Sequence, residues 1–121
     1  MSKKGDSIFI EHMLESINAI EDFSKGLTKK EFISSRLKQS AIVREIDIIG
    51  EAVKNISSGL KEKYKKIAWR DIAGTRDKMI HHYFGVDLEI VLGIIQNDLP
   101  VLKKQILRIK KDLGSFGKSI K

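Results

Sequence analysis

The sequence predicts an all-α protein, an up-and-down bundle of four to five helices that forms a single domain over residues 1–121. Apolar residues recur at steps of three and four along several segments, which is the spacing of one face of an α-helix. Strand-forming residues show no alternating runs, and the one proline leaves long segments free to be helical. With 41% hydrophobic residues, a chain of 121 residues can bury one core.

The first predicted helix begins near Asp6 or Ser7, either of which can cap its free amide groups, and ends at Gly26. Its apolar face consists of Ile10, Met13, Leu14, Ile17, Ile20 and Phe23. A capping box with the pattern T-x-x-E, from Thr28 to Glu31, then opens a second helical segment.

A long helix is predicted next, over residues 35–57, and Gly59 is predicted to end it. Its core face consists of Ile42, Ile46, Ile49, Val53 and Ile56. Gly50 lies inside this helix, where glycine costs about 1 kcal/mol relative to alanine. We therefore expect a neighbouring helix to approach closely at Gly50. The lysine-rich stretch 61–66 is expected to be an exposed connection.

A third helix is predicted over residues 69–82, with Gly85 breaking it and Asp87 capping the helix that follows. The stretch 97–100, which ends in the only proline, marks either a kink or a new helix start. The apolar positions of this half of the chain are Ile90, Val91, Ile94, Ile95, Leu102, Ile106, Ile109 and Leu113. Residues 115–121, after Gly114, are expected to form a frayed tail.

Composition restricts the classes of function. The net charge of +7 favours a polyanionic partner such as RNA, although charge alone fits a merely basic protein equally well. No cysteine is present, which excludes disulfides and thiolate metal sites. We see no phosphate-binding glycine loop and no H-E-x-x-H pattern, so no metal and no cofactor are predicted. Without a secretory signal or an apolar membrane span, the expected location is cytoplasmic.

The segment 69–87 is distinctive because it holds the only tryptophan, two of three histidines and one of two tyrosines. Within it, Arg76, His81 and Tyr83 form the pattern R-x4-H-x-Y. RNA can be cleaved without a metal when its 2′-hydroxyl attacks the adjacent phosphate. Histidine, with a reference pKa of about 6.5, suits the proton transfer, and arginine offers a permanent cation with forked donors. We therefore assign proton transfer to His81, and phosphate binding and transition-state charge to Arg76.

This pattern resembles the signature of HepT-like HEPN proteins. The I-G-E-A element at 49–52, Trp69, and the run 83–87 are also similar to that family, so the resemblance covers most of the chain. Asp77 departs from the family, in which asparagine is common at this position, but it keeps a polar supporting side chain. The resemblance implies a HEPN-like fold and a metal-independent endoribonuclease toxin. It also implies an MntA-like nucleotidyltransferase antitoxin as partner, and a homodimer with the active site near the dimer interface.

The same resemblance implies that the hydroxyl of Tyr83 is adenylylated by the partner, which silences the toxin. A bulky, negatively charged AMP group beside Arg76 would compete with RNA phosphate for the same cation. Geometry raises one objection, because positions i and i+5 lie about 140° apart around a regular helix. Unwinding near Gly85, or a second subunit, would bring Arg76 and His81 together, and we favour the dimer.

Ordinary structural roles compete with these assignments. Arg76 and Asp77 fit a surface ion-pairing stretch, His81 fits a helix-end histidine, and Tyr83 fits a half-buried packing residue. Trp69 is expected to anchor the core rather than to stack on bases.

Three further features stay open at this point. Glu51 is either buried beside Arg76 or exposed, and the basic run Lys103–Lys111 is either a solvated face or a guide for RNA. His12 lies off the apolar stripe and is expected to be solvated.

The leading functional hypothesis is therefore the nuclease toxin. The alternative is a non-catalytic partner subunit that binds substrate or nucleotide for a nucleotidyltransferase, and a structural dimerisation module is a third reading. The RNA target, the number of AMP groups added and any assembly beyond a dimer do not follow from the sequence.

Overall fold

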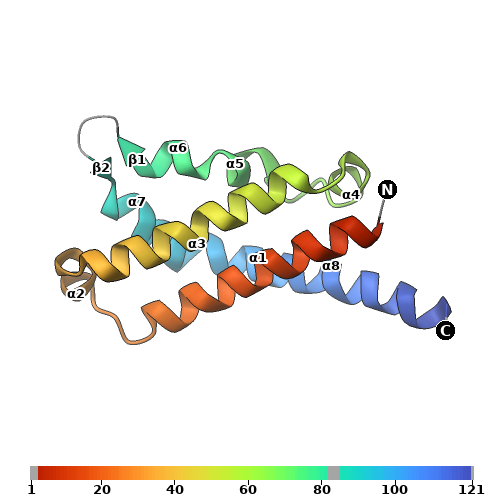
Figure 1. The fold of residues 1–121 in the computed structure, drawn as a ribbon, viewed down its shortest axis with the longest axis horizontal. Helices are drawn as coiled ribbons and strands as arrows, with labels where there is room; N and C mark the ends of the chain where they lie inside the picture. Colours follow the sequence, from red (N-terminus) through yellow and green to blue (C-terminus); the bar gives the residue numbers. More distant parts are fainter. Residues whose placement is uncertain (1–2, 82–84, 121) are drawn as a thin grey trace.

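The computed structural model describes residues 3–81 and 85–120, with side chains described for 5–79 and 85–114. Three long helices dominate it: α1 (Lys3–Ser24), α3 (Arg36–Asn55) and α8 (Leu99–Ile120). Figure 1 shows α1 running antiparallel to both α3 and α8, and α1 contacts both of them. The shorter elements are α2 (Lys29–Ser34), α4 (Ser58–Lys63), α5 (Trp69–Ala73), α6 (Thr75–Met79), β1 (Ile80–His81), β2 (Gly85–Val86), α7 (Leu88–Gly93) and the π-helical η1 (Ile94–Asp98). The all-α prediction is confirmed, apart from one two-residue strand pair.

The core lies where these long helices meet, and the predicted apolar faces are confirmed. The predicted core residues Ile42, Ile46, Ile49 and Val53 of α3 are buried, and so is Ile56, the residue that caps its end. In α1 the predicted stripe is buried from Ile10 to Ile20, and Phe23 is partly buried against the core. In α8, Leu102, Ile106 and Ile109 are buried and Leu113 packs against them. Burial of these side chains is the main source of stability for a bundle of this size.

The capping box at the start of α2 is present as predicted. Thr28 Oγ1 accepts a hydrogen bond from the Glu31 N–H at 3.1 Å, and Glu31 Oε1 accepts one from the Thr28 N–H at 2.9 Å. The Thr28 N–H and, at 3.1 Å, the Thr28 hydroxyl both donate to Glu31 Oε1, and these two bonds to the carboxylate lower the pKa of Glu31. Ser35 caps α3 in a similar way, accepting from the Lys38 N–H at 3.1 Å.

Asp6 does not cap α1, because α1 already begins at Lys3. Its buried carboxylate instead accepts hydrogen bonds from the N–H and the hydroxyl of Ser57, at 2.8 and 2.6 Å. Ser57 is the N-cap of α4, so Asp6 fastens α4 to α1. The sequence suggested a local cap, but the carboxylate meets a residue that only the antiparallel packing of α1 and α3 brings near.

Two predicted helix ends were wrong. Gly59 lies inside α4, and α8 continues past Gly114 to Ile120. A glycine ends a helix by adopting a positive φ, and among the described residues only Gly26 and Gly85 do so, at 69° and 75°. Fraying of the last residues stays a prediction.

From α7 to α8 the helical residues follow one another without a gap, so a new helix start at 97–100 was wrong. The Leu99 N–H donates to the carbonyl of Ile94, five residues back, which is the hydrogen bond of a π-turn. Both Ile94 and Leu99 are buried, although a step of five residues would separate them by about 140° in a regular helix. The wide π-turn keeps the Ile94 and Leu99 side chains on the core side of the helix. Pro100 follows this turn, at a place where a missing backbone N–H is tolerated.

No helix in the described part of the chain is long and apolar enough to cross a membrane.

Candidate functional site

The segment that carries R-x4-H-x-Y is not one helix. The predicted helix over residues 69–82 was wrong, because α5 ends at Ala73, Gly74 separates it from α6, and α6 ends at Met79. Residues 80 and 81 then form β1, which pairs antiparallel with β2 so that His81 lies opposite Gly85. The Asp87 N–H donates to the Met79 carbonyl at 2.6 Å and closes the same ladder. These backbone bonds to residues further along the chain replace the bonds that would have continued the helix.

This break removes the geometric objection to a shared site. Arg76 lies on α6 and the backbone of His81 lies in β1, so the angle of about 140° for one regular helix does not apply. Gly85, the ladder partner of His81, lines the same groove as Arg76. The His81 side chain and the whole of Tyr83 lie outside the described residues, so their assigned roles stay predictions.

Arg76 is an exposed cation with one carboxylate near it. Its Nη1 lies 3.9 Å from Oδ2 of Asp47 on α3, and the Arg76 side chain is 68% exposed. The other oxygen of Asp47, Oδ1, is buried and has no hydrogen-bond partner among the described residues. The ion pair is therefore long and leaves most of the guanidinium available to a ligand.

Asp47 was missed in the sequence analysis. It lies one turn before Glu51 in α3, and no local pattern links it to Arg76, which is distant along the chain. The link depends on α5 and α6 lying against α3. That packing is close at Gly50, where a Cβ would lie in van der Waals contact with the Ile72 and Ala73 carbonyl oxygens, at 3.4 and 3.5 Å. The prediction of a close helix approach at Gly50 is confirmed.

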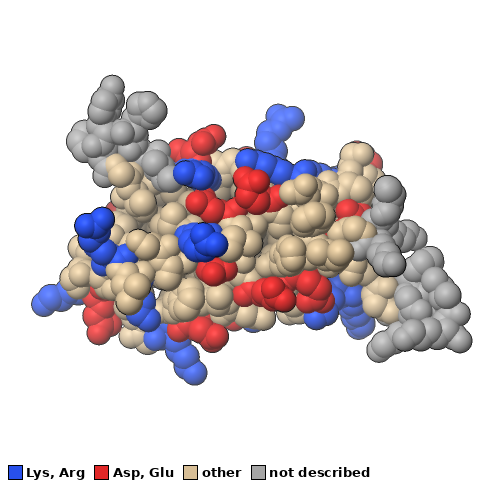
Figure 2. Space-filling view, in the orientation of Figure 1, with Lys and Arg blue, Asp and Glu red and all other residues tan. Residues whose placement is uncertain are grey.

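A groove of about 890 Å³ runs along α3 and contains this pair. Its walls come from α1, α6, β2 and α7, and its lining residues are Phe9, His12, Arg36, Gln39, Ser40, Val43, Arg44, Asp47, Ile48, Glu51, Ala52, Asn55, Arg76, Gly85, Val86 and Leu88. Figure 2 shows basic and acidic side chains next to each other over this face of α3 and over α6. The groove has both apolar and polar walls, and the three arginines among its lining residues give it cations that can bind a polyanion.

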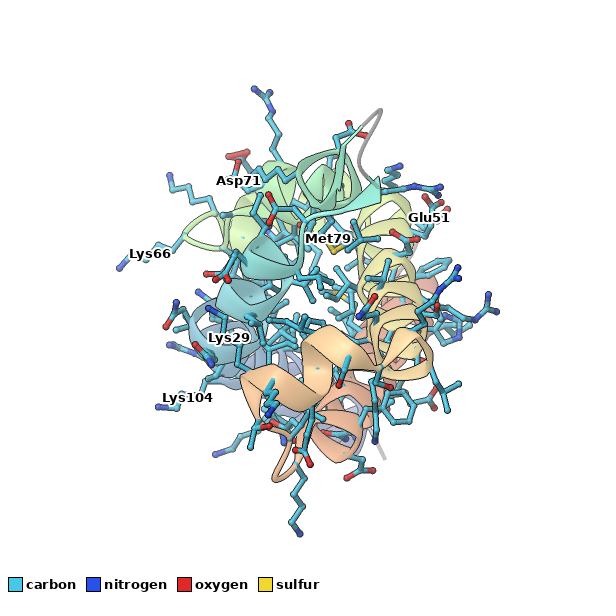
Figure 3. The ribbon with its side chains drawn as sticks, turned by 90° about the vertical axis from the view of Figure 1, so that its left-hand side faces the viewer. Lys29, Glu51, Lys66, Asp71, Met79 and Lys104 are labelled. Atoms are coloured by element: carbon cyan, nitrogen blue, oxygen red, sulfur yellow. The ribbon has the colours of Figure 1, made fainter. Side chains whose placement is uncertain are left out.

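Other predicted residues are placed as follows. Glu51 points outward from α3, as Figure 3 shows, and its exposed carboxylate pairs with Lys54 at 3.1 Å, so it is not buried beside Arg76. Asp77 is exposed, and its supporting role stays a prediction.

Trp69 is 8% exposed, and its indole N–H donates to the Tyr64 carbonyl at 3.1 Å, so the core-anchor interpretation is confirmed.

The basic run Lys103–Lys111 is partly neutralised by α1. Lys103 pairs with Glu21 at 2.7 Å, and Lys110 pairs with Glu11 at 3.0 Å. Two of its cations are thus engaged within the protein, which weakens its case as a guide for RNA.

A second groove, of about 650 Å³, lies between α5–α6 and the η1–α8 region. Figure 3 shows Met79 pointing into the interior, while Asp71 and Lys66, which both line this second groove, lie at the surface. Its lining is mainly apolar and includes neither Arg76 nor Asp47, so it is separate from the candidate site. No cluster of three or more metal-binding side chains occurs among the described residues.

Comparison with known proteins identifies the family to which this chain is similar. Residues 13–109 match the family model described as "Ribonuclease HepT-like". The chain is 36% identical over 109 residues to "Probable ribonuclease HepT" of Thermococcus cleftensis, which covers 90% of this chain and 99% of that protein. It is 42% identical over 111 residues to "Gamma-glutamylcyclotransferase and putative RNase MJ0434" of Methanocaldococcus jannaschii, covering 92% of this chain.

The match spans half of that second relative's length, so the relative contains a further part that this chain does not match. No solved structure gives a significant match. The family model covers most of the chain, and the Thermococcus relative is matched over nearly its whole length. The chain belongs to the HepT-like ribonuclease family.

Proposed function

We propose that this protein is a metal-independent endoribonuclease toxin whose catalytic residues are Arg76 and His81. The observation that carries the proposal is the placement of Arg76 in an arginine-rich groove beside Gly85, the ladder partner of His81. The guanidinium is mostly exposed and is held by one carboxylate at 3.9 Å, so a phosphate can displace that contact.

In the proposed reaction the RNA 2′-oxygen attacks the adjacent phosphorus while the bond from phosphorus to the 5′-oxygen breaks. The products are a 2′,3′-cyclic phosphate and a 5′-hydroxyl, and the proton leaving the 2′-hydroxyl is balanced by one gained at the 5′-oxygen. His81 transfers the proton, because an imidazole changes charge near neutral pH. Arg76 binds the phosphate and stabilises the charge that develops on its oxygens.

The family resemblance adds a partner and an assembly to this proposal. An MntA-like nucleotidyltransferase would serve as the antitoxin by transferring AMP to the hydroxyl of Tyr83. A homodimer with its active site near the interface would bring two copies of the R-x4-H segment together. AMP beside Arg76 would inhibit by charge, since its phosphate competes for the same guanidinium.

The test is cleavage of RNA by purified protein in excess EDTA. We expect wild type to cut, and Arg76→Ala and His81→Ala to lose at least about a hundredfold in rate, the usual scale for a catalytic acid–base group. Arg70→Ala is the matched control, because Arg70 is exposed on the neighbouring α5 and lines neither groove. Equal cleavage by all four proteins would mean contamination and would remove the nuclease assignment. Tight nucleotide binding without any cleavage would favour the non-catalytic partner subunit.

The two tyrosines of the chain offer a matched test of modification. With an MntA-like nucleotidyltransferase and ATP, we expect wild type and Tyr64→Phe to gain the mass of AMP and Tyr83→Phe to gain none. Tyr64 is a suitable control because its hydroxyl already donates to Asp112 at 2.5 Å. Labelling of Tyr83→Phe at the wild-type level would rule out Tyr83 as the acceptor.

A further inference from the structure

The groove that contains Arg76 continues along α3, where it carries two more arginines. Arg36 and Arg44 both line it, so this one groove holds three of the five arginines in the chain. Arg36 and Arg44 are eight residues apart, or about 12 Å along the helix axis. Arg44 lies one turn from Asp47, the carboxylate that contacts Arg76. The three cations therefore follow one another along a single surface.

These two arginines are available to a ligand. Both side chains are exposed, and neither forms an ion pair within residues 5–79 and 85–114. Elsewhere on the described surface lysines do pair with glutamates, in Lys29–Glu89, Lys54–Glu51, Lys103–Glu21 and Lys110–Glu11. The two acidic residues that line the groove are each matched by a cation, Glu51 by Lys54 and Asp47 by Arg76. Arg36 and Arg44 thus remain as surplus positive charge in the groove.

The α1 side of the groove carries two ring side chains in an edge-to-face arrangement. Phe9 and His12 line it, with ring centroids 5.8 Å apart and planes at 89°. His12 is exposed, as expected, but it faces the groove beside a partly buried Phe9. An exposed ring next to a basic surface is the combination that unpaired nucleotides use, because a base stacks on the ring while its phosphate meets a cation.

We propose that this face of α3 is a binding site for single-stranded RNA that flanks the phosphate to be cut. Arg44 holds the phosphate next to the one at Arg76, Arg36 holds one further along the strand, and the Phe9–His12 edge supports a base. This inference rests on the proposed nuclease function for the identity of its ligand. It assigns to α3 a role in substrate binding rather than in the chemical step.

The test measures binding apart from cleavage. A short fluorescein-labelled 2′-O-methyl single strand lacks the attacking hydroxyl, so it can bind but cannot be cut by the proposed reaction. By fluorescence anisotropy we expect Arg44→Gln to weaken binding about tenfold and to lower the salt dependence by about one phosphate contact. Arg70→Gln, the same change on an exposed arginine outside the groove, should bind like wild type.

The site is wrong if Arg44→Gln binds as well as wild type, if Arg70→Gln loses as much affinity, or if wild type does not bind. Equal affinity for a duplex of the same sequence would overturn the single-strand preference. These results are independent of catalysis. Loss of binding in Arg44→Gln, together with no cleavage of ordinary RNA by wild type, would leave the binding site standing and remove the nuclease function.

Discussion

The three long helices and the segment 69–87 are stabilised in different ways. In α1, α3 and α8 the contacts are between apolar side chains that are almost fully buried. In the described part of 69–87 only Trp69 and Met79 are buried, while Ile72, Ala73 and Val86 are partly buried against the core. The Trp69 indole bond, the close approach at Gly50 and the strand ladder add a few individual contacts. The difference implies that the candidate site can be displaced while the bundle stays folded.

The largest effect is expected from a cavity in the bundle. Ile106 is fully buried in α8, so Ile106→Ala should lower the free energy of unfolding by about 2–5 kcal/mol. Chemical denaturation followed by circular dichroism measures this loss. Leu107→Ala is the control, because Leu107 is 43% exposed on the same helix and should cost much less. Similar losses in both variants would contradict the packing described for α8.

A smaller and more local effect is expected at Gly50. Gly50→Val should push α5 away from α3, because a Cβ would already be in contact with the Ile72 carbonyl at 3.4 Å and valine adds two methyl groups beyond it. We expect the free energy of unfolding to fall by about 1–3 kcal/mol. The rate of RNA cleavage should fall by more than the loss of folded protein explains. Gly93→Val is the matched control, since a Cβ at Gly93 meets nothing within 4 Å. If Gly93→Val reduced cleavage as much as Gly50→Val, the close approach would not be what positions Arg76.

The smallest effect is a dependence of stability on alkaline pH. Burial and the hydrogen bond to Asp112 raise the pKa of Tyr64 to about 12. Because this pKa is above the unfolded value, the contribution of Tyr64 is complete below the unfolded pKa of about 10 and is lost as the pH rises toward 12. Thermal melts at pH values between 10 and 12 should show a falling melting temperature, and the fall should be smaller in Tyr64→Phe. An equally steep decline in Tyr64→Phe would mean that other groups cause it.

Much of the bundle was predictable because its signals are periodic and local. The stripes of α1 and α3, the capping box at Thr28 and the close approach at Gly50 each follow from residues within one helix. The helix predicted over 69–82 failed for the opposite reason. Its residues have helical preferences, but backbone pairing of 80–81 with 85–86 overrides them, and pairing between strands has no local signature here.

The candidate site was predictable only in part. Arg76 was found from its spacing to His81 and Tyr83, which is a property of the sequence. Asp47 was not found from the sequence, because its contact with Arg76 depends on how α6 lies against α3. The groove along α3 was missed for the same reason, since Arg44 and His12 come from different helices and meet only in the folded chain.

The π-turn at Ile94–Asp98 bears on how this helix can vary in length. Leu99 follows Ile94 by five positions, one more than the step of four that keeps two side chains on one face of a regular α-helix, and both are buried. Removing one exposed residue there, such as Asn97, would leave an ordinary turn with both side chains still facing the core. Loss of a single codon at this turn is therefore compatible with an unchanged register of α8.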